Sequence, residues 1–92
     1  MISGPILIVE DEKNLGITLS EYLRSIGYDC FLATNGIEAR RTFREKAPSV
    51  IFMDIGLPDA CGLKLAKEFK KERENFVLLF LSAQNDPEIK VE

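Results

Sequence analysis

Acidic side chains directly follow two of the most apolar segments of the chain. Glu10 and Asp11 come after the run 6–9, and Asp54 comes after the run 50–53. Carboxylates that converge repel one another, and a bound divalent cation relieves this repulsion. A site made only of oxygen ligands in an open cleft favours Mg²⁺ or Mn²⁺ over Zn²⁺. A carboxylate beside such a cation can attack a phosphoryl group and form an acyl phosphate.

A hydroxyl group occupies the equivalent place after a third apolar run. Ser82 follows the run 76–81, where its hydroxyl is expected to hydrogen-bond the oxygens of a bound phosphoryl group. Taken singly, each acid is explained as a solvated loop carboxylate, and serine commonly begins loops. The combination indicates a site, because these polar side chains follow successive apolar runs.

The apolar residues alternate between short continuous runs and stretches at helical spacing. The short runs predict strands, and the helical spacing predicts amphipathic helices. The predicted strands cover 6–9, 28–33, 50–53 and 76–81, and the predicted helices cover 14–26, 36–47 and about 64–74, with a fourth helix starting at 86–88. This alternation predicts right-handed βαβ units and a parallel sheet, an α/β fold. Ligands of such sheets bind beyond the carboxyl ends of the strands, so the acids converge if the two most apolar strands are neighbours.

Cap signals support the predicted helix boundaries. The first helix is predicted from the spacing of Leu15, Leu19, Tyr22, Leu23 and Ile26. Asn14 is the predicted N-cap of this helix, and Gly27 follows its end. Asn35 and Glu38 resemble a capping box at the start of the second helix. Asp29, within the second predicted strand, suits an edge of the sheet.

The chain of 92 residues has the length and composition of a single domain spanning residues 1–92. Apolar residues make up 46% and charged residues 29%, which is ordinary for a globular protein. The net charge of -3 argues against direct contact with nucleic acid. The chain has no histidine, which excludes Ser-His-Asp catalysis and histidine metal ligands.

The cysteines and the apolar runs bear on the cellular location. Cys30 and Cys61 are too few and too far apart for a disulfide scaffold, and both are expected to be buried thiols in a reducing cytosol. The sequence shows no features of a signal peptide and no apolar run of membrane-spanning length. We therefore expect a cytoplasmic protein without membrane contact.

Taken together, the motifs resemble the receiver domain of the response regulators of two-component signalling. The matching stretches are Ile-Leu-Ile-Val-Glu-Asp-Glu at 6–12, Ile-Phe-Met-Asp-Ile-Gly-Leu-Pro-Asp at 51–59 with Gly62, and Leu-Phe-Leu-Ser-Ala at 79–83. The resemblance implies a flavodoxin-like, doubly wound parallel sheet. Residues 1–92 would then supply four strands in the order 2-1-3-4, three full helices and the start of a fourth.

The resemblance also implies a role for each acid of the site. Asp54 would accept a phosphoryl group from the phosphohistidine of a sensor histidine kinase. Glu10, Asp11 and Asp54 would bind Mg²⁺, with Asp11 and Asp54 preferred as direct ligands, and the backbone carbonyl of Gly56 would be a further ligand. Such a domain is a phosphoacceptor and not an enzyme.

Further residues would shape the site or respond to the phosphoryl group. Ser82 would be the switch hydroxyl, and Ala83 the small residue that leaves the site open. Leu57, Pro58 and Gly62 would shape the loop after the third strand. Glu10 stands where aspartate is more usual, which is a common variation in the family.

One departure from the family pattern is large. The family places a lysine at the end of a fifth strand, which this sequence lacks, and Lys90 falls in the predicted start of the fourth helix. We therefore expect a truncated receiver domain without the fifth strand and fifth helix, which binds Mg²⁺ but is phosphorylated weakly or without coupling to a switch. The strand 76–81 would become an apolar sheet edge, which predicts a homo-oligomer that covers this strand or swaps an element.

Two other classes of protein fit parts of the same pattern. A pseudo-receiver, a protein-interaction module that is not phosphorylated, would have the same fold, but the intact acids argue against it. A phosphatase of the haloacid-dehalogenase type also uses a strand-end aspartate with Mg²⁺. Such an enzyme needs a second acid two residues further on, where this chain has Gly56.

Overall fold

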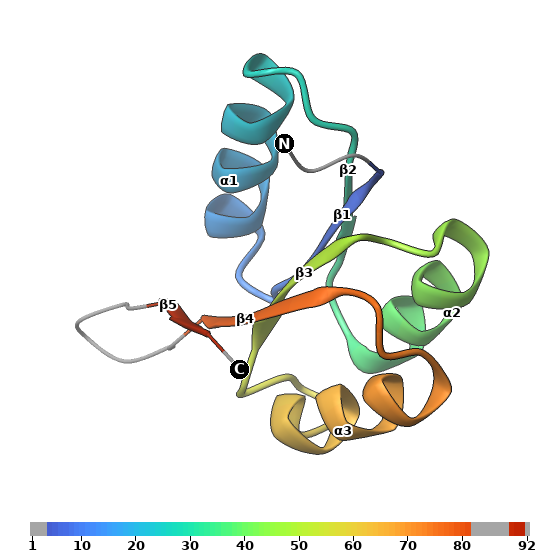
Figure 1. The fold of residues 1–92 in the computed structure, drawn as a ribbon. Coiled ribbons are helices and arrows are strands. Elements are labelled where there is room, and N and C mark those ends of the chain that lie inside the picture. Colours follow the sequence, from blue (N-terminus) through green and yellow to red (C-terminus); the bar gives the residue numbers. More distant parts are fainter. Residues whose placement is uncertain (1–3, 82–88, 92) are drawn as a thin grey trace.

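A computed structural model of the protein describes residues 4–81 and 89–91. The parallel strands are β1 (Ile6–Val9), β2 (Cys30–Ala33), β3 (Val50–Asp54) and β4 (Val77–Leu81). They lie in the order β2-β1-β3-β4, which confirms the predicted 2-1-3-4 topology and places β2 at an edge (Figure 1). In this order the two most apolar strands, β1 and β3, are neighbours.

Helices cover both faces of the sheet. They are α1 (Lys13–Ser25), α2 (Gly36–Lys46) and α3 (Gly62–Glu72). Figure 1 shows α1 on one face of the sheet and α2 with α3 on the other. No helix in the described ranges has the length and apolar character of a membrane span.

The larger core lies between the sheet and the pair α2 and α3. Phe43 of α2 stacks on Phe69 of α3 with ring centroids 4.1 Å apart, and Phe76 meets Phe43 edge-on at 5.5 Å. These rings pack against Leu7 and Ile51 from the alternate positions of β1 and β3. Because β1 and β3 are buried on both faces, their side chains supply this core and also the smaller one under α1.

The N-cap of α1 differs from the prediction. Glu12, not Asn14, is the N-cap, and its carboxylate accepts hydrogen bonds from Asn14 N at 3.3 Å and Leu15 N at 2.8 Å. The glutamate side chain is long enough to reach these free amides at the start of the helix. Gly27 has a φ of 103° directly after the C-cap Ile26, which confirms the predicted end.

The C-terminal part of the chain also differs from the prediction. Ile89–Val91 form β5, a short strand that pairs antiparallel with β4 through Leu79–Leu81. Lys90 therefore lies in a strand and not in a helix. The pairing satisfies backbone groups that an open β4 edge would leave without partners. Because β5 is antiparallel, it is not the parallel fifth strand of the family pattern; the predicted helix start at 86–88 lies outside the described residues.

Candidate functional site

The predicted acids meet at the carboxyl ends of β1 and β3. Glu10, Asp11 and Asp54 each offer a carboxylate oxygen, and these oxygens all lie within 4.8 Å of one another. The register of the sheet causes this, since Val9 of β1 pairs with Met53 of β3 and the next residues are Glu10 and Asp54. The structure thus brings together three residues that are up to 44 positions apart in the sequence, which is the difference between 10 and 54.

The acids differ in burial. Glu10 is 3% exposed and Asp54 is 1% exposed, whereas Asp11 is exposed to solvent. Glu10 Oε2 accepts a hydrogen bond from Glu12 N at 3.1 Å, and Asp54 Oδ1 accepts one from Gly56 N at 3.2 Å. Asp54 Oδ2 is buried and has no hydrogen-bond partner within residues 4–81 and 89–91. A buried carboxylate oxygen without a partner is costly, so this atom is where the site needs a ligand.

Burial of the acids alters their pKa values. Burial raises the pKa of Glu10 to about 7, and the neighbouring Asp54 carboxylate adds to the rise, while the hydrogen bond from Glu12 N–H opposes it. Burial likewise raises the pKa of Asp54, with a contribution from Asp11, against the hydrogen bond from Gly56 N–H. Both shifts reflect carboxylates crowded together in a poorly solvated place. A bound cation would oppose these rises in pKa, because it stabilises the ionised carboxylates.

The donor set fits Mg²⁺. All the side chains offered are carboxylates, and the backbone of Gly56 is exposed beside them. Hard oxygen ligands of this kind suit Mg²⁺ or Mn²⁺, whereas Zn²⁺ prefers sulfur and nitrogen. The exposed Asp11 leaves the site open on one side, so a metal could be reached by a second molecule.

The loop that follows β3 is compact. Gly62 N donates to Ile55 O at 2.8 Å, and Gly56 forms an isolated antiparallel bridge with Cys61. Leu57 is buried in the larger core. A Cβ at Gly62 would meet the carbonyl oxygen of Asp54, so only glycine fits this close approach. The structure thus places Leu57 and Gly62 where they shape the loop, while Pro58 is exposed.

Ser82 and Ala83 lie outside the described residues. Cys30 is buried as expected, but Cys61 is exposed, because it is the N-cap of α3 and lies in the loop. The expectation that Cys61 is buried is therefore wrong.

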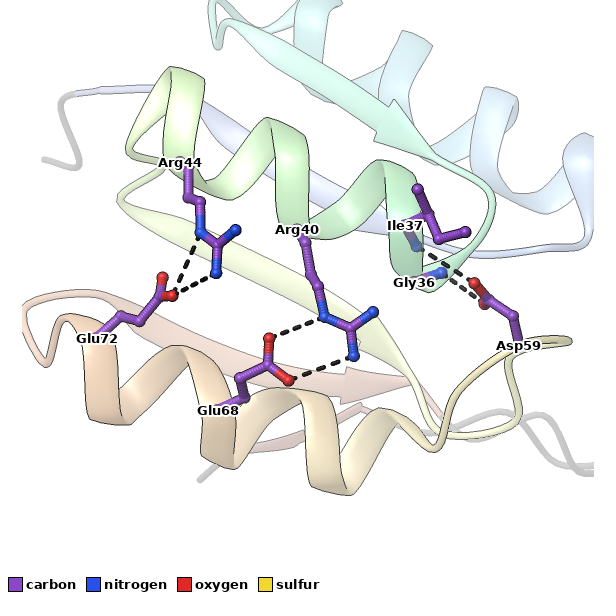
Figure 2. A network of polar contacts seen from close by, with 7 residues as sticks. All are labelled: Gly36, Ile37, Arg40, Arg44, Asp59, Glu68 and Glu72. Carbon is purple, nitrogen blue, oxygen red and sulfur yellow. Dashed lines mark hydrogen bonds and ion pairs between the residues drawn. The ribbon is translucent and has the colours of Figure 1, made fainter.

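One polar contact of this region was not predicted from the sequence. Asp59, in the loop after β3, accepts hydrogen bonds from Gly36 N at 2.7 Å and Ile37 N at 3.3 Å, at the start of α2 (Figure 2). The sequence carries no local signal for this contact, because the partners are more than 20 residues apart. An aspartate after a proline is ordinary in turns, so by itself it predicts no contact with a distant helix.

Fold and site together match a known family. A sequence model of the response regulator receiver domain matches residues 6–92. The chain belongs to this family, which is a signalling family and not a family of enzymes.

Individual relatives support the same placement. The chain is 41% identical over 81 residues to the aerobic respiration control protein ArcA of Escherichia coli, a match that covers 88% of this chain and 34% of ArcA. It is 29% identical over 86 residues to the sporulation initiation phosphotransferase F of Bacillus subtilis, covering 94% of this chain and 69% of that protein. The chain thus spans about a third of the length of ArcA.

Solved receiver domains have the same fold. The non-phosphorylated HemR receiver domain of Leptospira biflexa is 36% identical with a TM-score of 0.82, over 91% of this chain and 68% of that one. The response regulator TrrA of Thermotoga maritima, solved in complex with Mg(2+)-BeF, is 32% identical with a TM-score of 0.82, over 90% of this chain and 72% of that one.

Proposed function

We propose that this chain takes a phosphoryl group on Asp54 from the phosphohistidine of a sensor histidine kinase, with Mg²⁺ bound by Glu10, Asp11, Asp54 and the Gly56 carbonyl. One observation carries the proposal. The Asp54 carboxylate is buried, has an oxygen without a partner in the described part of the chain, and lies beside two further carboxylates. The Mg(2+)-BeF complex of TrrA supports the choice of metal and of a phosphoryl-like ligand.

The chemistry follows from the state of Asp54. A carboxylate oxygen of Asp54 would attack the phosphorus of the phosphohistidine, the phosphorus–nitrogen bond would break, and the imidazole would leave with the electron pair. The product is an acyl phosphate on Asp54. Bound Mg²⁺ would supply positive charge that neutralises the phosphoryl oxygens. The hydrogen bond from Gly56 N to Asp54 Oδ1 orients the carboxylate.

The test is transfer of a phosphoryl group from a small donor such as acetyl phosphate. The expected result is the mass increase of one phosphoryl group, dependent on Mg²⁺, in the wild-type chain and not in Asp54→Asn. Asp29→Asn is the matched control, because Asp29 is an exposed acid remote from the site. A modification that persists in Asp54→Asn would show that the acceptor is another residue.

A pseudo-receiver remains the second candidate. It would retain the fold without phosphorylation and would act through protein contacts. Titration with Mg²⁺, followed by amide chemical shifts of Gly56 and Asp11, separates the two. Absence of any Mg²⁺-dependent shift would favour the pseudo-receiver.

The strength of the phosphorylation is a separate prediction. Among residues 1–92, none matches the lysine that the family pattern places at the end of a parallel fifth strand, so we expect weak transfer and poor coupling for these residues taken alone. Ser82 would then act as the switch hydroxyl without that cation beside it. The test compares the phosphorylation of this chain with that of a chain extended beyond residue 92. Equal phosphorylation of the two would show that the lysine is not needed for transfer.

We also propose that the protein associates with itself and is located in the cytoplasm. The pairing of β5 with Leu79–Leu81 removes part of the open edge from which a homo-oligomer was predicted. Exposed apolar side chains remain on β4 and on α3, with Val77 46% and Leu63 45% exposed, so self-association is still our expectation. A clean monomer in light scattering at high concentration would contradict it. We place the protein in the cytoplasm, where its free thiols Cys30 and Cys61 stay reduced.

A further inference from the structure

The side chain of Asp59 joins the loop after the phosphoacceptor to the start of α2. Its Oδ1 accepts a hydrogen bond from Gly36 N at 2.7 Å, and its Oδ2 accepts one from Ile37 N at 3.3 Å (Figure 2). The two elements also approach closely, since a Cβ at Gly36 would lie 3.0 Å from Ala60 Cβ. The carboxylate therefore spans the first two amides of a helix that precedes it by more than 20 residues.

This contact completes the N-terminal cap of α2. The first amides of a helix have no partner within the helix and need external acceptors. Asn35 serves the next two, with Glu38 N donating to Asn35 Oδ1 at 2.8 Å and Ala39 N donating to Asn35 O at 3.0 Å. The cap is thus shared between a local residue and a loop residue. A carboxylate suits this end of a helix, and its pKa is lowered by the hydrogen bond from Gly36.

The same loop carries groups of the candidate metal site at its base. Gly56, whose carbonyl is a predicted ligand, donates its N–H to Asp54 Oδ1 and is bridged to Cys61. Asp59 lies between Gly56 and Cys61 in the sequence. A loop held at its base by this bridge and at its tip by Asp59 has little freedom to move Gly56.

Helix α2, whose first amides donate to Asp59, is held against α3. Arg40 of α2 pairs with Glu68 of α3 at 2.8 Å, and Arg44 pairs with Glu72 at 2.7 Å (Figure 2). Each arginine places two nitrogens on its glutamate. The stacked rings of Phe43 and Phe69 lie in the same helix pair. The Asp59 carboxylate is therefore anchored to a rigid unit.

We propose that Asp59 is a positioning residue that couples the metal site to the first turn of α2. The inference rests on the proposed function, because it assumes that Mg²⁺ binds at Asp54 and Gly56. Coupling between two sites is reciprocal. Mg²⁺ that fixes the loop should therefore strengthen the Asp59 cap, and loss of the cap should weaken Mg²⁺ binding.

The first experiment measures the coupling in the unaltered chain. Hydrogen exchange of the Gly36 and Ile37 amides is followed with and without Mg²⁺. Slower exchange of these amides with the metal is expected. Exchange that Mg²⁺ leaves unchanged would overturn the inference, provided that chemical shifts show the metal to be bound.

The second experiment compares two variants that each remove one capping side chain from the same helix. Asp59→Ala should weaken Mg²⁺ binding about five-fold or more, the lower end of ordinary coupling between sites. Asn35→Ala, which removes a hydrogen bond made within the first turn of α2 itself, should change it less than about two-fold, below the range of ordinary coupling. Circular dichroism checks that both variants fold. Equal metal affinity in the two variants would overturn the inference.

A milder variant and the wild-type control keep the outcomes distinct. Asp59→Asn retains one acceptor oxygen, so its metal affinity should lie between wild type and Asp59→Ala. If Asp59→Ala does not fold, Asp59→Asn takes its place, and an affinity equal to that of Asn35→Ala would overturn the inference. If the wild-type chain binds no Mg²⁺ at all, the proposed function fails, and not the role of Asp59 alone.

Discussion

At the scale of single residues, Asp54 shows a conflict between stability and function. Its carboxylate is 1% exposed and one of its oxygens has no partner among the described residues. Burial raises its pKa, so in the absence of metal the ionised form is less stable here than it would be in water. Functional sites commonly retain such a group because the chemistry needs it.

Asp54→Asn should therefore stabilise the metal-free protein. We expect a gain of about 1–2 kcal/mol in the free energy of unfolding, because a buried charge beside two carboxylates is removed. Urea denaturation in the presence of a chelator measures this gain. Mg²⁺ should further stabilise the wild-type chain but not the variant. Destabilisation by Asp54→Asn would contradict the view that these carboxylates repel one another.

The two cysteines should differ in reactivity. Cys61 is exposed, and the nearby N–H groups of Lys64 and Leu63 lower its pKa, whereas Cys30 is buried and burial raises the pKa of its thiol. Because the thiolate is the nucleophile, Cys61 should be alkylated first by iodoacetamide at neutral pH. Mass spectrometry of peptides from the folded protein checks the order. Comparable rates at both cysteines would contradict the exposed position of Cys61.

At the scale of elements, the caps show how local signals can mislead. Asn14 is a better N-cap residue than glutamate by type, yet Glu12 makes the capping hydrogen bonds of α1. Asn35 caps α2 as predicted, but Glu38 does not complete the capping box. Its carboxylate accepts from Thr34 N at 2.8 Å and Thr34 Oγ1 at 2.9 Å, one residue before the N-cap.

Substitutions at the start of α1 discriminate between the two N-caps. Glu12→Ala should lower the stability by about 1 kcal/mol, because it removes the acceptor for two helix amides. Asn14→Ala should have almost no effect, because Asn14 is exposed and its hydrogen bond to Glu12 is made by its backbone N–H, which the substitution retains. Thermal unfolding of both variants measures the difference. A larger loss of stability for Asn14→Ala than for Glu12→Ala would show that Asn14 is the N-cap.

The Glu38 carboxylate should make the stability depend on pH. Its hydrogen bonds from Thr34 lower its pKa in the folded state. A lowered pKa means that its contribution is fully present above the unfolded pKa of about 4.3 and is lost as the pH falls through the folded value. The stability difference between wild type and Glu38→Gln should therefore shrink below that pH. Glu45→Gln, at an exposed glutamate near the other end of α2, is the control for the same change of charge.

At the scale of the whole molecule, the packing of the layers decides which apolar side chains are buried. Leu65, Ala66 and Phe69 are buried on the inner face of α3. In α1 and at its C-cap, by contrast, Leu15, Tyr22 and Ile26 are 43%, 61% and 54% exposed, although they share helical spacing with the buried Leu23. The described residues place α1 alone on its face of the sheet, so only the side turned to the strands is covered.

Alanine substitutions of apolar residues in the core and on the surface should differ greatly in their effect on the free energy of unfolding. Phe69→Ala should cost about 3–5 kcal/mol, because it removes a ring that is 1% exposed and stacked on Phe43. Ile37→Ala should cost less than about 0.5 kcal/mol, because Ile37 is 65% exposed. Chemical denaturation compares the two. Similar losses would contradict the burial of Phe69 in the larger core.

The sequence by itself determined the alternation of strands and helices, the parallel sheet and the acids of the site, whereas the order of the strands was implied by the resemblance to the receiver family. It could do so because periodicity and cap residues act over a few neighbours, and because parallel strands bring their carboxyl ends to one edge. Tertiary structure decided the rest. The Asp59 contact joins residues far apart in the chain, the open edge of β4 selected a strand at Ile89–Val91, and the number of layers over each face set which apolar side chains are buried. None of these depends on local sequence, because each is set by what another part of the chain presents.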